Sequence, residues 1–207
     1  MKRLENDFIK VYDIDGRVFY GGAQRWFGKK YVRTSGCGII AAANLILYLQ
    51  GKHEITVAEY MELAEGLKKR ILMIPYLGMN ALMLSISMNG LLKRYGIEKK
   101  AFPKLTPIGF FKKTEKLIAA GIPVIMAIGR DFPLIWRKSR LGLYSENNGV
   151  KHRVKDVSAH FVTITGIDDE WLTVSSWGQK LYISRKELSD FAWKKSTWIL
   201  TNIIEIK

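Results

Sequence analysis

One stretch of the chain reads Ser35-Gly36-Cys37-Gly38 and runs on into Ile39-Ile40-Ala41-Ala42-Ala43-Asn44-Leu45-Ile46-Leu47-Tyr48-Leu49. This alanine-rich run is apolar on nearly every side, which predicts a buried helix over residues 39–49. Cys37 would then stand at the helix N-terminus, where unpaired N–H groups and the helix dipole favour the thiolate, the reactive form of cysteine. Gly36 and Gly38 leave backbone space beside the sulfur, which a substrate would need.

A histidine far along the chain supplies a second candidate catalytic group. Residues 158–166 read Ser-Ala-His-Phe-Val-Thr-Ile-Thr-Gly, a β-branched segment that predicts a strand with His160 near its start. One cysteine and one distant histidine are the sequence outline of a Cys–His hydrolase. The competing interpretation is that Cys37 is a small buried hydrophobe, as an isolated cysteine more often is.

The chain has two other histidines that could serve as the base. His53 lies in a connection between predicted helices, where a structural role on the surface is expected. His152 stands among Lys151, Arg153 and Lys155, and we expect it to belong to a basic surface. His160 is the favoured base, because a rigid strand can hold an imidazole against a nucleophile at a helix tip.

A catalytic histidine needs a group that orients its second ring nitrogen. The segment after His160 turns at Asp168-Asp169-Glu170 and returns through residues 171–178, which predicts a hairpin. The returning strand brings residue 175 or 176 beside the histidine, and Ser175 is the expected partner.

Acyl transfer also needs donors for the negative charge that develops on the carbonyl oxygen. The backbone N–H of Cys37 at the helix start is one candidate. The side chain of Gln24, in the Gly- and Trp-rich segment 21–27, is the other.

Composition limits the class of protein. The chain has 207 residues, 48% of them hydrophobic, which favours one folded domain over residues 1–207. A single cysteine excludes an intramolecular disulfide, and the first residues lack the apolar run of a secretory signal, so we expect a cytoplasmic location. No apolar stretch approaches the length of a membrane span. One cysteine and three scattered histidines show no metal-ligand spacing, so we expect neither a metal nor another cofactor.

The net charge of +14 is unusually high. This charge favours the binding of a polyanion, such as nucleic acid or anionic lipid. The alternative is a lysine-rich surface with no dedicated partner. The cations form small clusters at 68–70, 99–100 and 151–155, with no recognised nucleic-acid-binding motif.

The order of predicted elements is a helical half followed by a strand-rich half, an α+β layout. Helices are expected at 56–71, 79–94, 107–120 and 185–194, the first with a Thr56–Glu59 capping box. Strands are expected at 123–128, 158–166, 171–175, 180–183 and 198–206. A long loop is expected over 130–157.

These motifs together resemble a papain-like cysteine peptidase, and most closely the bacterial peptidase C39-like group. The resemblance rests on Gln24, on the Cys37-Gly38 opening of an alanine-rich helix, on Ala159-His160-Phe161-Val162, and on Ser175-Ser176-Trp177-Gly178. It covers roughly residues 20–200. It implies a papain-like fold in which the nucleophile helix packs on a C-terminal antiparallel sheet.

The resemblance also implies a chemistry. Cys37 would be the nucleophile, His160 the base and Gln24 the oxyanion donor, in a hydrolase that cuts a peptide or other amide through an acyl-enzyme. Ser175 stands where the family has Asn or Asp, and Gln24 lies farther upstream of the cysteine than in papain. The alternative is a weak or inactive papain-like binding protein whose basic surface contacts a polyanion.

Overall fold

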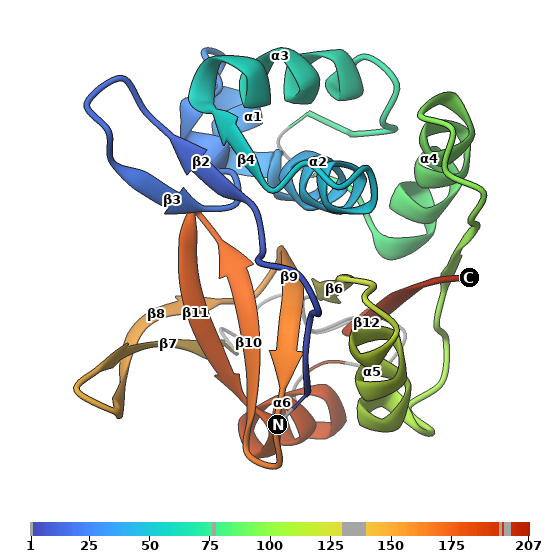
Figure 1. Ribbon diagram of the computed structural model, residues 1–207. Coiled ribbons are helices and arrows are strands. Elements are labelled where there is room, and N and C mark those ends of the chain that lie inside the picture. Colours follow the sequence, from blue (N-terminus) through green and yellow to red (C-terminus); the bar gives the residue numbers. More distant parts are fainter. Residues whose placement is uncertain (1, 76–77, 130–139, 195, 197–199) are drawn as a thin grey trace.

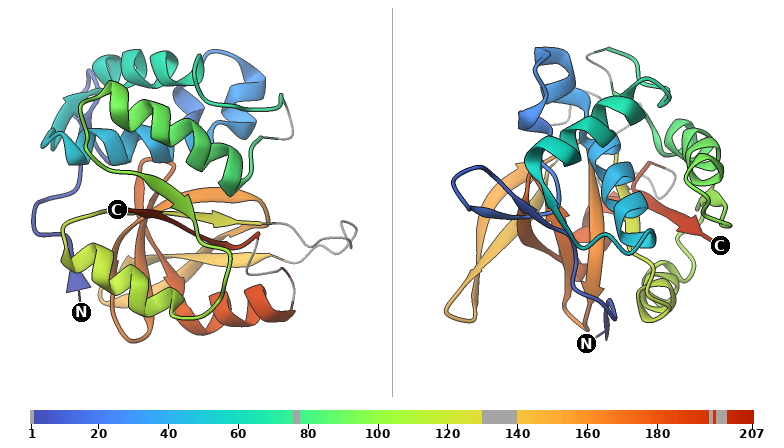
Figure 2. Two further views of the ribbon diagram at one scale, coloured as in Figure 1. Left: turned by 90° about the vertical axis from the view of Figure 1, so that its right-hand side faces the viewer. Right: turned by 45° about the horizontal axis from the view of Figure 1, so that its top comes forward.

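The fold is given by a computed structural model that describes residues 2–75, 78–129, 140–194, 196 and 200–207. A helical part with a small sheet lies against a large sheet, and two further helices flank that large sheet (Figures 1 and 2). The buried apolar side chains of both parts form one continuous core. This is a mixed α+β architecture, as the order of predicted elements indicates.

The large sheet is antiparallel throughout. Its strand order is β5-β12-β6-β9-β10-β11-β7-β8, and β1 pairs with β9 beside this path. The strands are β1 (Lys2–Arg3), β5 (Ala101–Pro103), β6 (Val124–Ile128), β7 (Leu141–Asn147), β8 (Val150–Val157), β9 (His160–Ile167), β10 (Trp171–Ser176), β11 (Gln179–Ser184) and β12 (Asn202–Ile206).

The remaining elements surround this sheet. A small sheet has the order β3-β2-β4, in which β2 and β4 are parallel. Its strands and the helices are β2 (Lys10–Tyr12), β3 (Val18–Tyr20), β4 (Glu54–Thr56), the 3-10 turn η1 (Gln24–Trp26), α1 (Lys30–Ser35), α2 (Cys37–Leu49), α3 (Val57–Lys68), α4 (Ala81–Arg94), α5 (Phe110–Ala119) and α6 (Arg185–Lys194).

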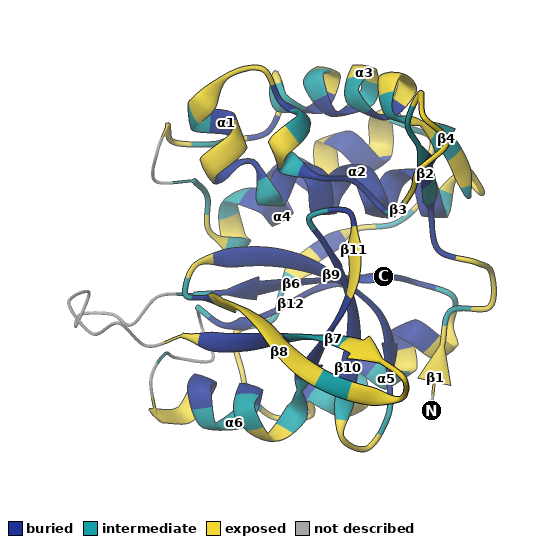
Figure 3. Ribbon diagram, turned by 90° about the vertical axis from the view of Figure 1, so that its left-hand side faces the viewer, coloured by how far each residue is buried: buried dark blue, intermediate teal, exposed yellow. Residues whose placement is uncertain are grey.

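Helix α2 is the centre of the molecule. It is buried from Gly38 to Tyr48 and packs against β9, β6 and α3 (Figure 3). Its alanines, Ala41 to Ala43, permit close approach of the neighbouring backbones, while each large apolar residue such as Leu45 stabilises the fold by about 1.5–3 kcal/mol on burial. The sequence prediction of a buried helix here is confirmed.

Most other predicted elements lie within a few residues of their expected positions. The capping box is present: Thr56 Oγ1 accepts from the Glu59 N–H, and the Glu59 carboxylate accepts from the Thr56 N–H. The last strand begins at Asn202, and the expected residues 198 and 199 lie outside the described part. No sequence signal predicts the three strands of the small sheet or β5, because each spans only three residues.

The expected loop over 130–157 is wrong for its second half. Residues 141–157 form the hairpin β7–β8, which turns at Asn148 and Gly149, both with positive φ as a two-residue hairpin loop requires. The strand β8 lies at the sheet edge with most side chains exposed, so it shows no alternation of apolar and polar residues. Residues 130–139 of the expected loop lie outside the described part.

Among the described residues, no helix is both long and apolar enough to cross a bilayer.

Candidate active site

Cys37 is the first residue of α2, directly after the short helix α1. Gly36 joins the two helices, and a Cβ on it would lie 2.6 Å from the carbonyl oxygen of Val32. Only glycine fits at this junction without moving the backbone. The Gly36 N–H donates to that same Val32 oxygen at 2.7 Å, which ends α1 and sets Cys37 at the tip of α2.

Burial works against the activated thiolate that the position of Cys37 at a helix N-terminus predicts. Burial raises the pKa of the thiol, and the backbone N–H groups near the sulfur, that of Phe161 first, oppose this only in part. In the free protein, Cys37 is therefore a neutral thiol at neutral pH. The desolvation comes from packing the helix tip against β9.

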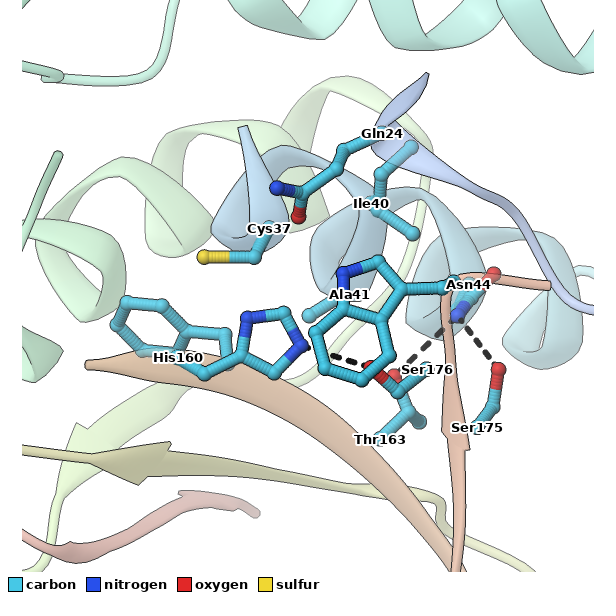
Figure 4. A pocket seen from close by; sticks show the side chains of 11 residues that line it. Gln24, Cys37, Ile40, Ala41, Asn44, His160, Thr163, Ser175 and Ser176 are labelled. Carbon is cyan, nitrogen blue, oxygen red and sulfur yellow. Dashed lines mark hydrogen bonds between the residues drawn. The ribbon is translucent and has the colours of Figure 1, made fainter. Parts of the chain in front are cut away.

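His160 is the first residue of β9, opposite Ile128 of β6. Its imidazole is buried, and its Nε2 lies 2.7 Å from Ser176 Oγ. Figure 4 shows the ring between Cys37 and Ser176, so the other nitrogen, Nδ1, is the one available to the cysteine. The strand thus holds the imidazole beside the N-terminus of α2, as the sequence indicates.

Trp177 covers the imidazole. The two rings stack with centroids 4.5 Å apart and an interplanar angle of 19°. Trp177 and Gly178 form the two-residue turn from β10 to β11, and Trp177 has a φ of 52°, a backbone conformation that costs a bulky residue energy. On the other side of the indole, Lys155 Nζ lies 3.8 Å from the ring centroid.

This environment keeps the imidazole neutral. Burial, and secondarily the charge of Lys155, lower the pKa of His160 to about 3. The resting pair is therefore a neutral thiol and a neutral imidazole. Burial of both groups therefore disfavours a charged thiolate–imidazolium pair in the free protein.

The hydroxyl beside the histidine belongs to Ser176, not to the expected Ser175. A β-bulge at Thr165 explains the difference: Thr173 pairs with Gly166, but Val174 pairs with Ile164. Without that extra residue, Ser175 would lie on the same face of the sheet as His160. With it, Ser176 does.

Ser175 instead joins a buried polar cluster around Asn44. Its hydroxyl donates to the Tyr20 carbonyl at 2.7 Å and lies 3.5 Å from Asn44 Nδ2. Asn44 Oδ1 accepts from the Gly22 N–H at 3.1 Å and from the Tyr60 hydroxyl at 2.8 Å. The cluster ties the segment before η1 to α2 and β10.

Asn44 is a site residue that the sequence interpretation missed. It lies two helical turns after Cys37 and lines the same small cavity. The available signal was a polar residue inside an otherwise apolar helix, since a buried amide must find hydrogen-bond partners. Gly21 and Gly22 allow this contact: a Cβ on Gly21 would meet Ser175 Oγ at 2.5 Å, and one on Gly22 would meet the Tyr60 ring at 2.2 Å.

Gln24 lines the cavity beside Cys37 (Figure 4). Its Nε2 donates to the carbonyl oxygens of Arg33 at 2.7 Å and Thr34 at 3.3 Å, near the end of α1. Helix α1 folds the intervening chain back, so that Gln24 and Cys37 line one cavity although they are far apart in the sequence. The amide nitrogen is anchored to α1, and its longer bond, to Thr34, is the weaker one.

The cavity that these residues enclose is small, at about 10 Å³. That is about the space of one water molecule. His53 and His152 do not line it. His53 packs edge-on against Tyr48, with ring centroids 5.1 Å apart, and His152 is exposed on β8. No group of three or more His, Cys, Asp or Glu side chains suited to a metal occurs in the described part of the chain.

Comparisons with known proteins give one informative result. No protein-family model matches the sequence, and no curated protein does. Among solved structures, the chain is similar to a crystal structure of a Bacillus anthracis protein provisionally described as a C39-like peptidase. The two share 16% sequence identity with a TM-score of 0.51, over 90% of this chain and 94% of that one. This similarity supports a C39-like fold.

Proposed function

We propose that the protein is a papain-like cysteine hydrolase that cuts a peptide or other amide, with Cys37 as nucleophile and His160 as base. The observation that carries the proposal is the contact of His160 Nε2 with Ser176 Oγ, which leaves Nδ1 facing the cavity that Cys37 lines. A nucleophile, a base and a group that orients the base are the parts that acyl transfer needs. The C39-like fold of the structural neighbour supports the same assignment.

In the proposed reaction, proton transfer accompanies attack because the resting pair is neutral. His160 Nδ1 takes the thiol proton as Cys37 Sγ attacks the carbonyl carbon. The negative charge moves to the carbonyl oxygen, which the Cys37 N–H and the Gln24 amide stabilise. The C–N bond then breaks, the amine leaves with the proton from His160, and a thioester on Cys37 remains.

Water completes the cycle by the same route. His160 takes a proton from a water molecule that attacks the thioester carbonyl, and the C–S bond breaks to release the acid. The proton returns to the sulfur. Ser176 holds the ring in place through both halves of the reaction, because its Oγ accepts from the Nε2–H of the tautomer in which Nδ1 is the base.

The test is turnover of a peptide-amide library by purified protein. Cys37→Ser and His160→Ala should each abolish hydrolysis, and thioester formation on Cys37 should be trapped at low pH and seen by mass spectrometry. His152→Ala is the matched control, because this exposed histidine does not line the cavity. Full turnover in either active-site variant would overturn the proposal.

A second candidate is a weakly active or inactive binding protein on this fold. The observation that favours it is that the group on His160 Nε2 is the hydroxyl of Ser176, since a hydroxyl carries no charge to stabilise an imidazolium. Under this alternative the library substrates are turned over slowly or not at all, and little or no thioester accumulates on Cys37.

A further inference from the structure

A second, larger cavity opens beside the small one that contains Cys37. It has a volume of about 450 Å³ and shares two lining residues, Gln24 and Trp177, with the catalytic cavity. Its lining residues belong to η1 and α1 on one side and to β8 and β11 on the other. A substrate held here would reach Cys37 directly past these two shared side chains.

The charged side chains that line this cavity are all positive. Arg25, Arg33 and Lys155 line it, and no acidic side chain of the described residues does. None of the three cations forms an ion pair with an acid in the described part of the chain, whereas some other cations there do, such as Lys113 with Glu205. Three cations around one hollow, with no acid among the described residues that line it, create a strongly positive potential.

Two of the three cations also lie against aromatic rings. The Arg25 guanidinium lies 5.6 Å from the centroid of Phe19, and Lys155 lies on Trp177. Val154 and Leu181 supply apolar surface to the same cavity. The cavity therefore combines oriented positive charge with apolar walls, which suits the carboxylate and the methylene groups of an acidic side chain.

We propose that this cavity binds acidic residues of the peptide substrate next to the scissile bond, so that Arg25, Arg33 and Lys155 make the enzyme selective for acidic peptides. The inference rests on the hydrolase function proposed above. Part of the high net charge then has a specific role, because these cations pair with substrate carboxylates.

A peptide fits this hollow better than a nucleic acid does. The volume suits one or two side chains, and the three cations surround it rather than form the extended track that a phosphate backbone requires. A further group of cations, Lys93, Lys99, Lys100 and Lys207, lines a different cavity near the end of α4. Those lysines provide matched controls for the test.

The experiment measures binding without turnover, in Cys37→Ser protein. The probes are a fluorescein-labelled octapeptide rich in glutamate, its glutamine analogue, and an oligothymidylate of similar length, each followed by anisotropy at about 50 mM salt. We expect the glutamate peptide to bind at least about tenfold more tightly than the glutamine analogue. Arg33→Gln and Lys155→Gln should each weaken it about 3- to 10-fold, and Lys99→Gln should leave it unchanged.

Two results would overturn the proposal: equal binding of the two peptides, or an equal loss in the Lys99→Gln control. Tighter binding of the oligothymidylate, lost in the same Arg33 and Lys155 variants, would assign the cavity to nucleic acid instead. The readout is independent of catalysis. If the protein binds acidic peptides selectively but turns over no substrate, the hydrolase function is rejected and the acidic-ligand site is kept. If the protein turns over substrates with no preference for acidic ones, the acidic-ligand site is rejected and the hydrolase function is kept.

Discussion

The hydroxyl of Ser176 lies 2.7 Å from His160 Nε2, while the hydroxyl of its neighbour Ser175 points to Tyr20 and Asn44. Adjacent serines thus have different roles on opposite faces of β10. One faces the imidazole, and the other belongs to the buried cluster that joins β10 to α2. This division can be measured.

Alanine at these two positions should separate catalysis from stability. Ser176→Ala removes the group that orients His160 and should lower kcat about tenfold, the equivalent of one neutral hydrogen bond of about 1–1.5 kcal/mol. Ser175→Ala should lower the free energy of unfolding by about 1–2 kcal/mol and leave kcat near that of the wild type. Steady-state kinetics and urea unfolding of both variants check this. The reverse pattern would place Ser175 at the histidine.

Asn44 should be among the most sensitive buried positions. Asn44→Leu leaves the Gly22 N–H without its acceptor and removes a partner of Tyr60, both in a buried setting. We expect a loss of about 2–4 kcal/mol in the free energy of unfolding, measured by urea denaturation. Tyr60→Phe, which removes one hydroxyl of the same cluster, should cost about 1 kcal/mol. Equal, small losses in both variants would contradict the cluster.

The reactivity of Cys37 toward iodoacetamide should follow that of a neutral, half-buried thiol. Because burial raises the pKa of this thiol, the alkylation rate of the free protein should stay low through neutral pH and rise only above the ordinary range of cysteine. His160→Ala should not change the shape of the profile. A rapid plateau near pH 5–6 that this variant abolishes would mean that a thiolate–imidazolium pair exists at rest.

His160 should make stability depend on pH. Its pKa is near 6.5 when unfolded and about 3 when folded, so between these values the unfolded state binds the extra proton. The free energy of unfolding should therefore fall as the pH drops from 6.5 toward 3, by up to about 1.4 kcal/mol per pH unit from this group. Above pH 6.5 the group contributes no slope.

Comparison with His160→Gln isolates that contribution, since the other titrating groups are common to both proteins. The difference between the two unfolding free energies should change with pH only below about 6.5. A constant difference down to pH 4 would show that the imidazole takes up protons as freely in the folded state as in the unfolded one.

Gln24 should matter for kcat more than for folding. Its short bond to the Arg33 carbonyl anchors the amide, and its longer bond to Thr34 is the one that can be exchanged for an oxyanion. Loss of an oxyanion donor typically lowers kcat by about 10²–10³-fold. Gln24→Ala should show that loss with little change in KM. A kcat within about threefold of the wild type would restrict Gln24 to holding α1.

The sequence predicts the central helix, the strand that begins at His160 and the α+β order because each has a strong local signal. The all-apolar run of 39–49 and the β-branched run after His160 need no tertiary information to interpret. The β7–β8 hairpin and the short strands of the small sheet lack such signals. An exposed edge strand is as polar as a loop, and three residues are too few to show a period.

The details of the candidate site depend on strand register and packing, which the sequence does not reveal. The pairing of Cys37 with a strand histidine follows from residue types, but the partner of that histidine depends on whether β9 carries an extra residue at Thr165. No local sequence pattern predicts a β-bulge of this kind. Likewise the neutral state of the pair depends on how tightly the helix tip packs, which overrides the effect of the helix N-terminus on Cys37.

The bulge has a consequence for how robust the site is. A slip of one residue between β9 and β10 would exchange the faces of residues 175 and 176. In most strands such a slip would replace a polar side chain at the imidazole by an apolar one. Here both positions are serine, so either alignment offers a hydroxyl to His160 and another to Asn44. The tandem serines make the surroundings of the histidine tolerant of the insertion or deletion of one residue.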